Sequence, residues 1–355
     1  MESLSKLLSV PTQDLQALLN SKEHPVILDH IEIHNNVDIQ DLLFRRRLYD
    51  LAASLGFTVK VIIADQYAEL EGQFDGDYLK IPVATAVVSR LFANSPAKLL
   101  FTGEYRSPQY WAMTLDFATR NSLNAIKEVA KCVNSDAEKM NSSHIYAISM
   151  ACIEPMYHNA DLVILREFEQ ELAELTANYL EILRNDPVFP TTPQEAKFLD
   201  EIPKTPIFAI VKDVETCNVF ITDFDAKKIK LSSKIKKTFC APGDVARNPV
   251  RDFLAFLTFD NGKELTLHRD EKNGGDITFK SVDDLNKAIA DESVHPADLK
   301  DNLKNMIVEI LEENVKIFGD EKMEITVKSK KKREGFEKKE VSLKDLFEKN
   351  YSALF

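Results

Sequence analysis

Two short segments of the chain carry residues whose types and spacing could bind a nucleotide or a nucleic acid. Residues 230–234 read KLSSK, and their ammonium and hydroxyl groups could donate hydrogen bonds to phosphate oxygens. Residues 295–298 read HPAD, so that a ring and a carboxylate lie within one helical turn and could contact a nucleobase. Each segment also has a structural interpretation, because KLSSK suits a solvated basic helix face and Asp298 suits the positive end of a helix dipole. The spacing alone leaves both interpretations open.

The positions of glycine exclude the common phosphate-binding loops over much of the chain. Such loops need glycine because their backbone amides approach the anion closely, often with positive φ. The first glycine is Gly56, and none lies between Gly103 and Gly243. The pair Gly274-Gly275 matches neither a Walker loop nor a GxGxxG motif, and we expect it to form a turn.

The net charge of −12 argues against a protein that holds DNA through bulk positive charge. Lysines are nevertheless concentrated in residues 227–237 and 328–339, which is compatible with local contacts to RNA. The four cysteines lie at least twenty positions apart, a spacing that fits neither a metal site nor a disulfide framework, and it favours a reducing, cytoplasmic compartment. No apolar run approaches the length of a membrane span. We therefore predict no metal, cofactor, DNA or membrane partner.

The first half of the chain alternates between strand and helix patterns. Residues 24–34 and 57–65 are strand-like, the second being a nearly continuous apolar run of the kind found in buried parallel strands. Residues 38–57 form an amphipathic helix pattern that stops near Gly56, and another helix and strand follow over 77–95 and 97–103. This alternation predicts a parallel sheet with helices on both faces. Further expected elements are one helix over 1–19, helices within 110–184, strands at 205–211 and 218–224, and Trp111 in the core.

After about residue 222 helix patterns dominate. We predict an α/β fold with a Rossmann-like parallel-sheet domain over residues 1–222, a mainly α-helical domain over 223–318 and a charged tail over 319–355. The predicted helices of the second domain cover 226–240, 248–259, 281–292 with a Ser281 N-cap, and 295–318. The tail is predicted to be partly disordered up to a short helix at 342–355.

Three ordered segments in the second half carry a family resemblance. Residues 239–250 (FCAPGDVARNPV), 267–285 (LHRDEKNGGDITFKSVDDL) and 295–303 (HPADLKDNL) resemble the anticodon-binding domain of archaeal and eukaryotic tyrosyl-tRNA synthetases. Residues 57–65 and 98–117 look like the second strand and the following aromatic region of the same enzymes. The resemblance covers most of residues 3–318 and implies a class I synthetase catalytic domain followed by a helical anticodon-binding domain.

The same resemblance implies that the catalytic half is degenerate. The KMSKS loop that grips ATP in the family corresponds to residues 211–218, which lack serine and glycine, so KLSSK is a basic helix and not that loop. The HIGH element corresponds to residues 34–47, which contain His34 but no glycine. The positions that read tyrosine in the family all carry a different residue type here, so the family's own carboxylates for the substrate ammonium are not kept. By alignment these positions are Met150, Glu154, Tyr157, Ile164 and Arg166. The histidines at 24, 30, 34, 144 and 158 are interpreted as structural.

For the second half the resemblance implies anticodon recognition. His295 and Asp298 would contact the first anticodon base, and Cys240 would lie near the middle base. Asn273 stands where the family usually has an aromatic residue that stacks on a flipped base. Backbone contacts to the tRNA are predicted for Lys234, Lys236 and Lys237.

The function predicted from these residues is that of a tyrosyl-tRNA synthetase-like pseudo-subunit. It would bind the tRNA(Tyr) anticodon and support aminoacylation by an active synthetase half, within a homodimer, a heterodimer or a duplicated enzyme. Two alternatives stay open on sequence alone. One is a divergent but active tyrosine–tRNA ligase, and the other is a repurposed scaffold that binds a protein and no tRNA.

Overall fold

The computed structural model divides the chain into two compact units. The first contains Met1–His34, Arg46–Ile81 and Phe92–Asp213, and the second contains Asn35–Arg45, Pro82–Leu91 and Val214–Phe355. The structure describes residues 1–34, 37–70, 80–92, 94–133, 142–185, 204–212, 216–220, 229–259, 262–318, 322–328 and 336–342.

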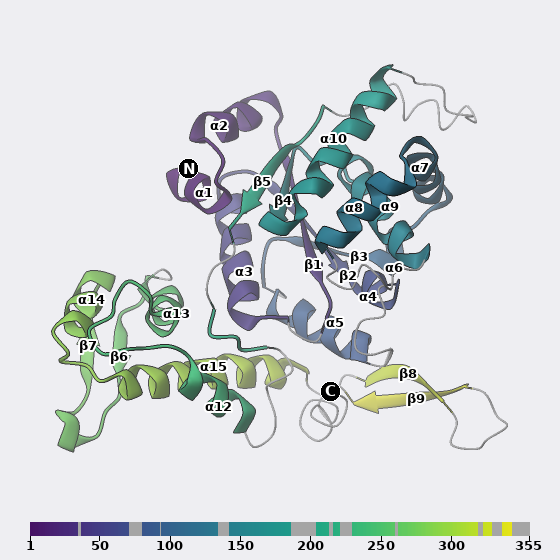
Figure 1. Cartoon of the computed structure of the whole chain (residues 1–355). Coiled ribbons are helices and arrows are strands. Elements are labelled where there is room, and N and C mark those ends of the chain that lie inside the picture. Colours follow the sequence, from purple (N-terminus) through teal and green to yellow (C-terminus); the bar gives the residue numbers. More distant parts are fainter. Residues whose placement is uncertain are drawn as a thin grey trace. The chain divides into compact units, whose positions relative to one another are not determined.

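The first unit is built on a five-stranded parallel sheet (Figure 1). The strand order is β3-β2-β1-β4-β5, with bounds Val26–Glu32 for β1, Thr58–Ala64 for β2, Lys98–Phe101 for β3, Leu162–Arg166 for β4 and Ile207–Val211 for β5. The central strands are almost continuously apolar and buried, as expected for strands covered on both faces. The predicted α/β fold with a Rossmann-like parallel sheet is confirmed.

Helices connect the strands of this sheet. Their bounds are α1 Glu2–Leu8, α2 Thr12–Ser21, α3 Ile39–Ser54, α4 Asp65–Leu70, α5 Lys80–Leu91, α6 Thr102–Tyr105, α7 Pro108–Arg120, α8 Leu123–Val133, α9 Ser142–Tyr157 and α10 Gln170–Asn185. One buried apolar cluster lies where α7, α8, α9 and α10 pack together and against strands β1, β2 and β4. Tyr110, Phe117, Met150 and Tyr179 are fully buried there. Across the described residues, no helix combines the length and the apolar character that crossing a bilayer requires.

The single helix expected over residues 1–19 is wrong, because two helices occupy this region. Helix α1 ends where Ser9 takes a left-handed conformation with φ of 54°. Pro11, the N-cap of α2, has no backbone N–H to continue the first helix. Both helices still bury leucines at helical spacing, which explains why the sequence pattern looked continuous.

The second unit is mainly helical, as predicted. Its elements are α12 Ile229–Lys237, α13 Pro249–Leu257, β6 Leu265–Leu267, β7 Ile277–Phe279, α14 Val282–Ala290 and α15 Pro296–Phe318. Helix α15 packs against α12, α13 and β6 through Leu299, Leu303 and Ile307, which are buried. The Ser281 hydroxyl accepts from the Asp284 N–H, so the predicted N-cap is confirmed. The strand expected at 218–224 is not formed at its described residues, where Phe220 makes only a single bridge with Asp38.

Part of the charged tail is ordered, which corrects the expectation of disorder before residue 342. Strands β8 (Lys322–Lys328) and β9 (Phe336–Ser342) pair in antiparallel fashion. In the sequence of β8, Met323, Ile325 and Val327 alternate with polar residues, which is the period of a strand. The helix expected at 342–355 lies outside the described residues after Ser342.

One polar contact ties the centre of the sheet to the helix α3. Asp29, on β1, is 2% exposed, and the Tyr49 hydroxyl donates to its Oδ2 at 2.5 Å. Tyr49 is itself fully buried.

We expect Tyr49→Phe to lower the free energy of unfolding by about 1–3 kcal/mol, because a buried carboxylate loses a donor while the ring packing is kept. Urea unfolding at neutral pH measures this. The matched control is Ser95→Ala, which removes an exposed hydrogen bond to Asp50 and should change stability by at most about 0.5 kcal/mol. Equal effects of the two substitutions would contradict the structural role of the buried contact.

Candidate functional site

The strand order of the sheet reverses between β1 and β4, since β2 and β3 lie on one side of this pair and β5 on the other. In open α/β sheets, ligands bind outside the carboxyl ends of the strands at such a point. Two small cavities lie here in the first unit, and His30 of β1 and Ala151 of α9 line both. We call the two cavities together the switch-point pocket.

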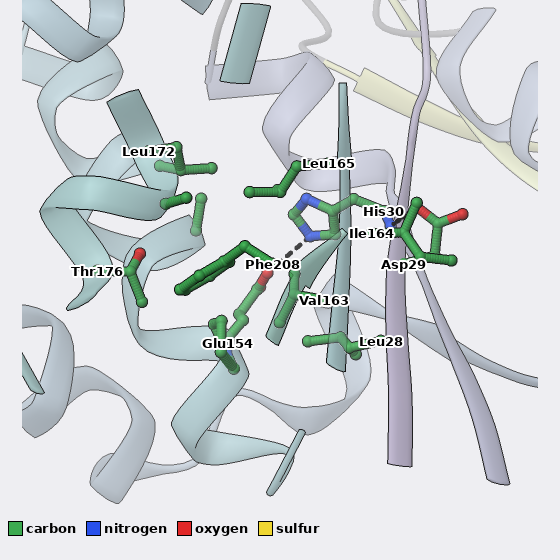
Figure 2. Close-up of a pocket in the computed structure, with 13 residues that line it drawn as sticks. Leu28, Asp29, His30, Glu154, Val163, Ile164, Leu165, Leu172, Thr176 and Phe208 are labelled. Carbon is green, nitrogen blue, oxygen red and sulfur yellow. Dashed lines mark hydrogen bonds and ion pairs between the residues drawn. The ribbon is translucent and has the colours of Figure 1, made fainter. Parts of the chain in front are cut away.

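A buried carboxylate dominates this pocket. Glu154, on α9, is 1% exposed. Its Oε1 accepts from the hydroxyls of Tyr67 at 2.9 Å, Tyr105 at 2.7 Å and Tyr110 at 3.0 Å. Its Oε2 lies 2.6 Å from His30 Nε2, and Figure 2 shows the two side chains facing each other. Both oxygens are therefore occupied by side chains of this chain.

The charges of the pocket follow from these contacts. Burial alone would lower the pKa of His30, but the charge of Glu154 and its hydrogen bond outweigh burial and raise this pKa to about 9. Burial would raise the pKa of Glu154, but His30 and the tyrosine hydroxyl of Tyr105 hold it below its ordinary value. At neutral pH the pocket therefore contains an imidazolium–carboxylate pair.

Burial also shifts the pKa values of the groups packed around the His30–Glu154 pair. Burial, helped by the charges of Lys60 and His30, lowers the pKa of His158 to about 4. Burial and the Glu154 charge raise the pKa values of the three tyrosines that bond to Glu154 above their ordinary value. Within the described residues, no group of acidic, histidine and cysteine side chains is arranged to hold a metal ion.

The side chains leave little free space in the switch-point pocket. The two cavities measure ≈ 20 Å³ and ≈ 30 Å³, which is the room that one or two water molecules need. The walls of the smaller cavity are mostly apolar and come from β1, β4, β5, α9 and α10. The other cavity is lined by β1, β2, α4 and α9, and Glu32, His34 and Glu169 are among its polar residues.

The two segments expected to correspond to synthetase nucleotide-binding elements, residues 34–47 and 211–218, bond to each other. From residues 34–47, the Asp38 carboxylate accepts from the Thr216 hydroxyl at 2.8 Å, and the Gln40 carbonyl accepts from the Cys217 N–H at 3.1 Å. The Ile39 N–H also donates to the Val219 carbonyl at 2.9 Å. All of these residues belong to the second unit. Their polar groups thus serve packing between two stretches of backbone.

A second group of candidate residues surrounds the start of α15 in the second unit. His295 is exposed and caps this helix, because its Nδ1 accepts from the Ala297 N–H at 3.1 Å. In the neutral ring Nε2 then carries the proton and can donate outward. Asp298, in the first turn, is half-buried.

Helix α12 lies beside α15, and the Lys300 ammonium donates to the Lys236 carbonyl at 2.9 Å. Lys236 and Lys237 are exposed, whereas the Lys234 ammonium lies 3.6 Å from the centre of the Phe220 ring. The lysines of KLSSK therefore belong to a helix and not to a loop, as predicted.

Cys240 follows α12, is 9% exposed, and has its pKa raised by burial. Asn273 ends a short 3₁₀ turn between β6 and β7. Gly274 and Gly275 follow with φ of 95° and 69°, so the glycine pair forms the expected turn.

Comparison with known proteins finds relatives that all carry one name, tyrosine–tRNA ligase. Tyrosine–tRNA ligase 2, cytoplasmic, from Arabidopsis thaliana is 28% identical over 316 residues, which cover 84% of this chain and 40% of the plant protein. Tyrosine–tRNA ligase 1, cytoplasmic, from the same plant is 24% identical over 318 residues, covering 85% of this chain and 80% of the relative. The chain is a homologue of the archaeal and eukaryotic tyrosyl-tRNA synthetases. No family model matches it.

Solved structures agree with this assignment at the level of the fold. Tyrosyl-tRNA synthetase from Archaeoglobus fulgidus, solved with L-tyrosine, superposes with a TM-score of 0.69 at 20% identity. The match covers 89% of this tyrosyl-tRNA synthetase homologue and 98% of the archaeal chain. The homologue thus shares the architecture of a tyrosyl-tRNA synthetase, although its aligned region is less than half the length of the first plant relative.

The structure places the five aligned positions of this homologue in different surroundings. Glu154 lines one of the two cavities. Arg166 ends β4, where its N–H donates to Glu169 Oε2, and it does not line either cavity. Of the other aligned positions, Ile164 lines one cavity, Met150 is in the core, and the Tyr157 hydroxyl donates to the Tyr105 carbonyl.

The structure brings together residues that the sequence pattern does not link. His30, predicted to be structural, pairs with Glu154, and three tyrosines for which the sequence predicts no role bond to the same carboxylate. A signal was available, since Glu154 is the one charged residue in the run 145–157 and such a residue needs partners when buried. Trp111, expected in the core, is 39% exposed.

We expect the stability of the chain to be greatest near pH 6.5. Above this pH the folded chain keeps a proton on His30 that the unfolded chain has lost, so stability falls as pH rises towards 9. Below it the unfolded chain holds a proton on His158 that the folded chain excludes, so stability falls as pH drops towards 4. The rise in the pKa of His30 from 6.5 to about 9 corresponds to roughly 3 kcal/mol in the free energy of unfolding.

Urea unfolding from pH 4.5 to 9.5 measures both limbs. The double substitution His30→Gln/Glu154→Gln should flatten the alkaline limb, because it removes the imidazolium and its partner together. His158→Gln is the matched control and should flatten only the acidic limb. An alkaline limb that persists unchanged in the double variant would contradict the assignment to this pair.

Proposed function

We propose that the chain is a tyrosyl-tRNA synthetase-like pseudo-subunit that works in the cytoplasm. Its second unit binds the tRNA(Tyr) anticodon, and its first unit forms no tyrosyl-adenylate. It supports aminoacylation by an active synthetase half, either as a separate partner or within a longer enzyme. The observation that carries the proposal is the saturation of Glu154 by His30 and the three tyrosines.

The Glu154 cluster supports the loss of tyrosine activation for an electrostatic reason. A substrate ammonium needs a carboxylate that it can approach, but both oxygens of Glu154 already have donors from the chain itself. The imidazolium of His30 would moreover repel a second cation at this position. With cavities of ≈ 20 Å³ and ≈ 30 Å³, the pocket favours a role as a folded core over one as a substrate site.

The bonds between Asp38, Gln40, Thr216 and Cys217 support the loss of ATP binding. Catalysis of adenylate formation depends on donors placed in advance around phosphate charge. An ionised Asp38 offers only acceptor oxygens and no donor to a phosphate chain, and it already accepts from Thr216. Cys217 is 2% exposed, and its thiol donates to the Pro249 carbonyl at 3.6 Å.

The second unit supports tRNA binding by what it exposes. His295 and Asp298 lie within one turn at the start of α15, with the exposed Lys236 and Lys237 on the neighbouring helix α12. A ring, a carboxylate and nearby cations are the groups that read a single-stranded base and hold its phosphates. The half-buried Lys234, on the Phe220 ring, makes a smaller contribution to phosphate binding in this proposal than its exposed neighbours.

Pairing with another chain is supported by an apolar surface on the first unit. Trp111 and Leu115 lie one turn apart on α7 and are 39% and 55% exposed. Large apolar side chains that share a helix face are typical of contact surfaces between proteins. We therefore include a synthetase subunit, either a second copy or an active half, as the proposed partner.

We expect the purified chain to catalyse no tyrosine-dependent exchange of pyrophosphate into ATP, because neither the ammonium nor the triphosphate finds its partners. Millimolar tyrosine should also leave the melting temperature unchanged, since a ligand stabilises only a state that it binds. An active archaeal tyrosyl-tRNA synthetase under the same conditions is the positive control. Exchange that requires tyrosine would instead establish a divergent active ligase.

We expect Asp298→Ala to weaken binding of tRNA(Tyr) by about tenfold, with little effect on an anticodon-substituted tRNA, because a base-edge contact contributes roughly 1–3 kcal/mol of discrimination. Filter binding at one fixed, moderate salt concentration measures both affinities. Asp301→Ala is the matched control, since this exposed carboxylate on the same helix pairs only weakly with Lys304. Equal binding of all tRNAs by the unmodified chain would favour a scaffold that has lost tRNA recognition.

A further inference from the structure

A buried amide connects the two segments that carry the proposed anticodon-binding residues. Asn302, on the second turn of α15, is 5% exposed. Its Oδ1 accepts from the His268 N–H at 2.9 Å, and its Nδ2 donates to the His268 carbonyl at 3.1 Å. Nδ2 also donates to the Asp298 carbonyl at 2.9 Å. One side chain thus fixes the end of β6 to the first turn of α15.

The loop between β6 and β7 is held at a second point by Arg269. Its Nε donates to the Gly275 carbonyl at 2.9 Å, and its Nη1 reaches the Ser293 carbonyl at 3.5 Å. At Gly274 an added Cβ would come within 3.4 Å of the guanidinium, and φ there is 95°, so the close approach of the loop depends on glycine. The loop is therefore a fixed platform beside the start of α15.

This platform presents an imidazole ring. The His268 side chain is 73% exposed, and its Nδ1 lies 2.8 Å from Asp276 Oδ2. The carboxylate limits rotation of the ring while leaving its face open to solvent. Because the backbone of His268 and the backbone of Asp298 bond to the same amide, the backbone that carries this ring lies beside that of a residue proposed to contact the first anticodon base.

We propose that Asn302 is a positioning residue for anticodon recognition and that His268 is the ring it places, on which an unstacked RNA base lies. The proposal rests on the tRNA-binding function proposed above. The His268 ring supplies the stacking partner that Asn273 cannot provide, because an amide side chain has no aromatic face. Sequence-tolerant stacking on His268 then adds to the edge contact of Asp298, and the amide of Asn302 keeps the two in register.

The test measures the ratio of affinities for tRNA(Tyr) and for anticodon-substituted tRNA, using the full chain at one fixed salt concentration. His268→Ala should weaken tRNA(Tyr) binding roughly tenfold, the effect of losing one base stack. His268→Phe should restore it, since phenylalanine provides a face but no link to Asp276. Asn302→Ala should lower the ratio to a similar extent while the weaker binding through phosphates is kept.

Thr258→Ala separates positioning from a general loss of stability. Thr258 is 3% exposed, and its hydroxyl bonds only within its own helix, to the Leu254 carbonyl, so this variant should lose stability and keep the affinity ratio. An unchanged tRNA(Tyr) affinity in His268→Ala together with an unchanged ratio in Asn302→Ala, with anticodon dependence intact in the unmodified chain, would overturn this inference alone. If the unmodified chain shows no anticodon dependence, the proposed function itself fails.

Discussion

A carboxylate buried in an apolar interior must be neutralised, and most of the first unit is organised around that requirement at Glu154. An unpaired charge there would cost several kcal/mol in desolvation, so the chain supplies an imidazolium and three phenols from four separate elements. These are β1, α4, α6 and α7, which converge on α9. The contacts fill the crevice at the point where the strand order reverses. The same interaction therefore links five elements of the unit at one point of the sheet edge.

The two segments expected to correspond to synthetase nucleotide-binding elements are also joined by hydrogen bonds, in the second unit. Asp38 and Gln40 direct their acceptors at the backbone and hydroxyl around Thr216 and Cys217. In an enzyme these stretches would present donors to a phosphate chain, which requires polar groups without partners in the protein. Here the polar groups have partners, and their hydrogen bonds connect residues 38–40 to residues 216–217. In the proposed function these residues stabilise the fold and take no part in catalysis.

The helical part of the second unit keeps its exposed groups available. The buried Asn302 and Thr258 make their hydrogen bonds to groups of this same unit. The side chains of His268 and His295 remain at the surface. A buried amide that bridges two segments makes the surface above it rigid, because all of its hydrogen bonds are satisfied in only one conformation. A rigid surface suits recognition of a base that must be unstacked, since little further ordering is then required.

The sequence by itself determined the parallel sheet, the helices of the second unit and the family, because these depend on local apolar periodicity and on ordered motifs such as residues 239–250 and 295–303. It also showed that KLSSK lies in a helix. Only the tertiary structure showed that His30 and three tyrosines meet at Glu154, since these residues are up to 124 positions from it and no local pattern links them. The break at Ser9–Pro11 and the exposure of Trp111 were likewise decided by how elements pack. Periodicity records which face of an element is apolar, whereas the partner of a buried charge depends on the global arrangement of the chain.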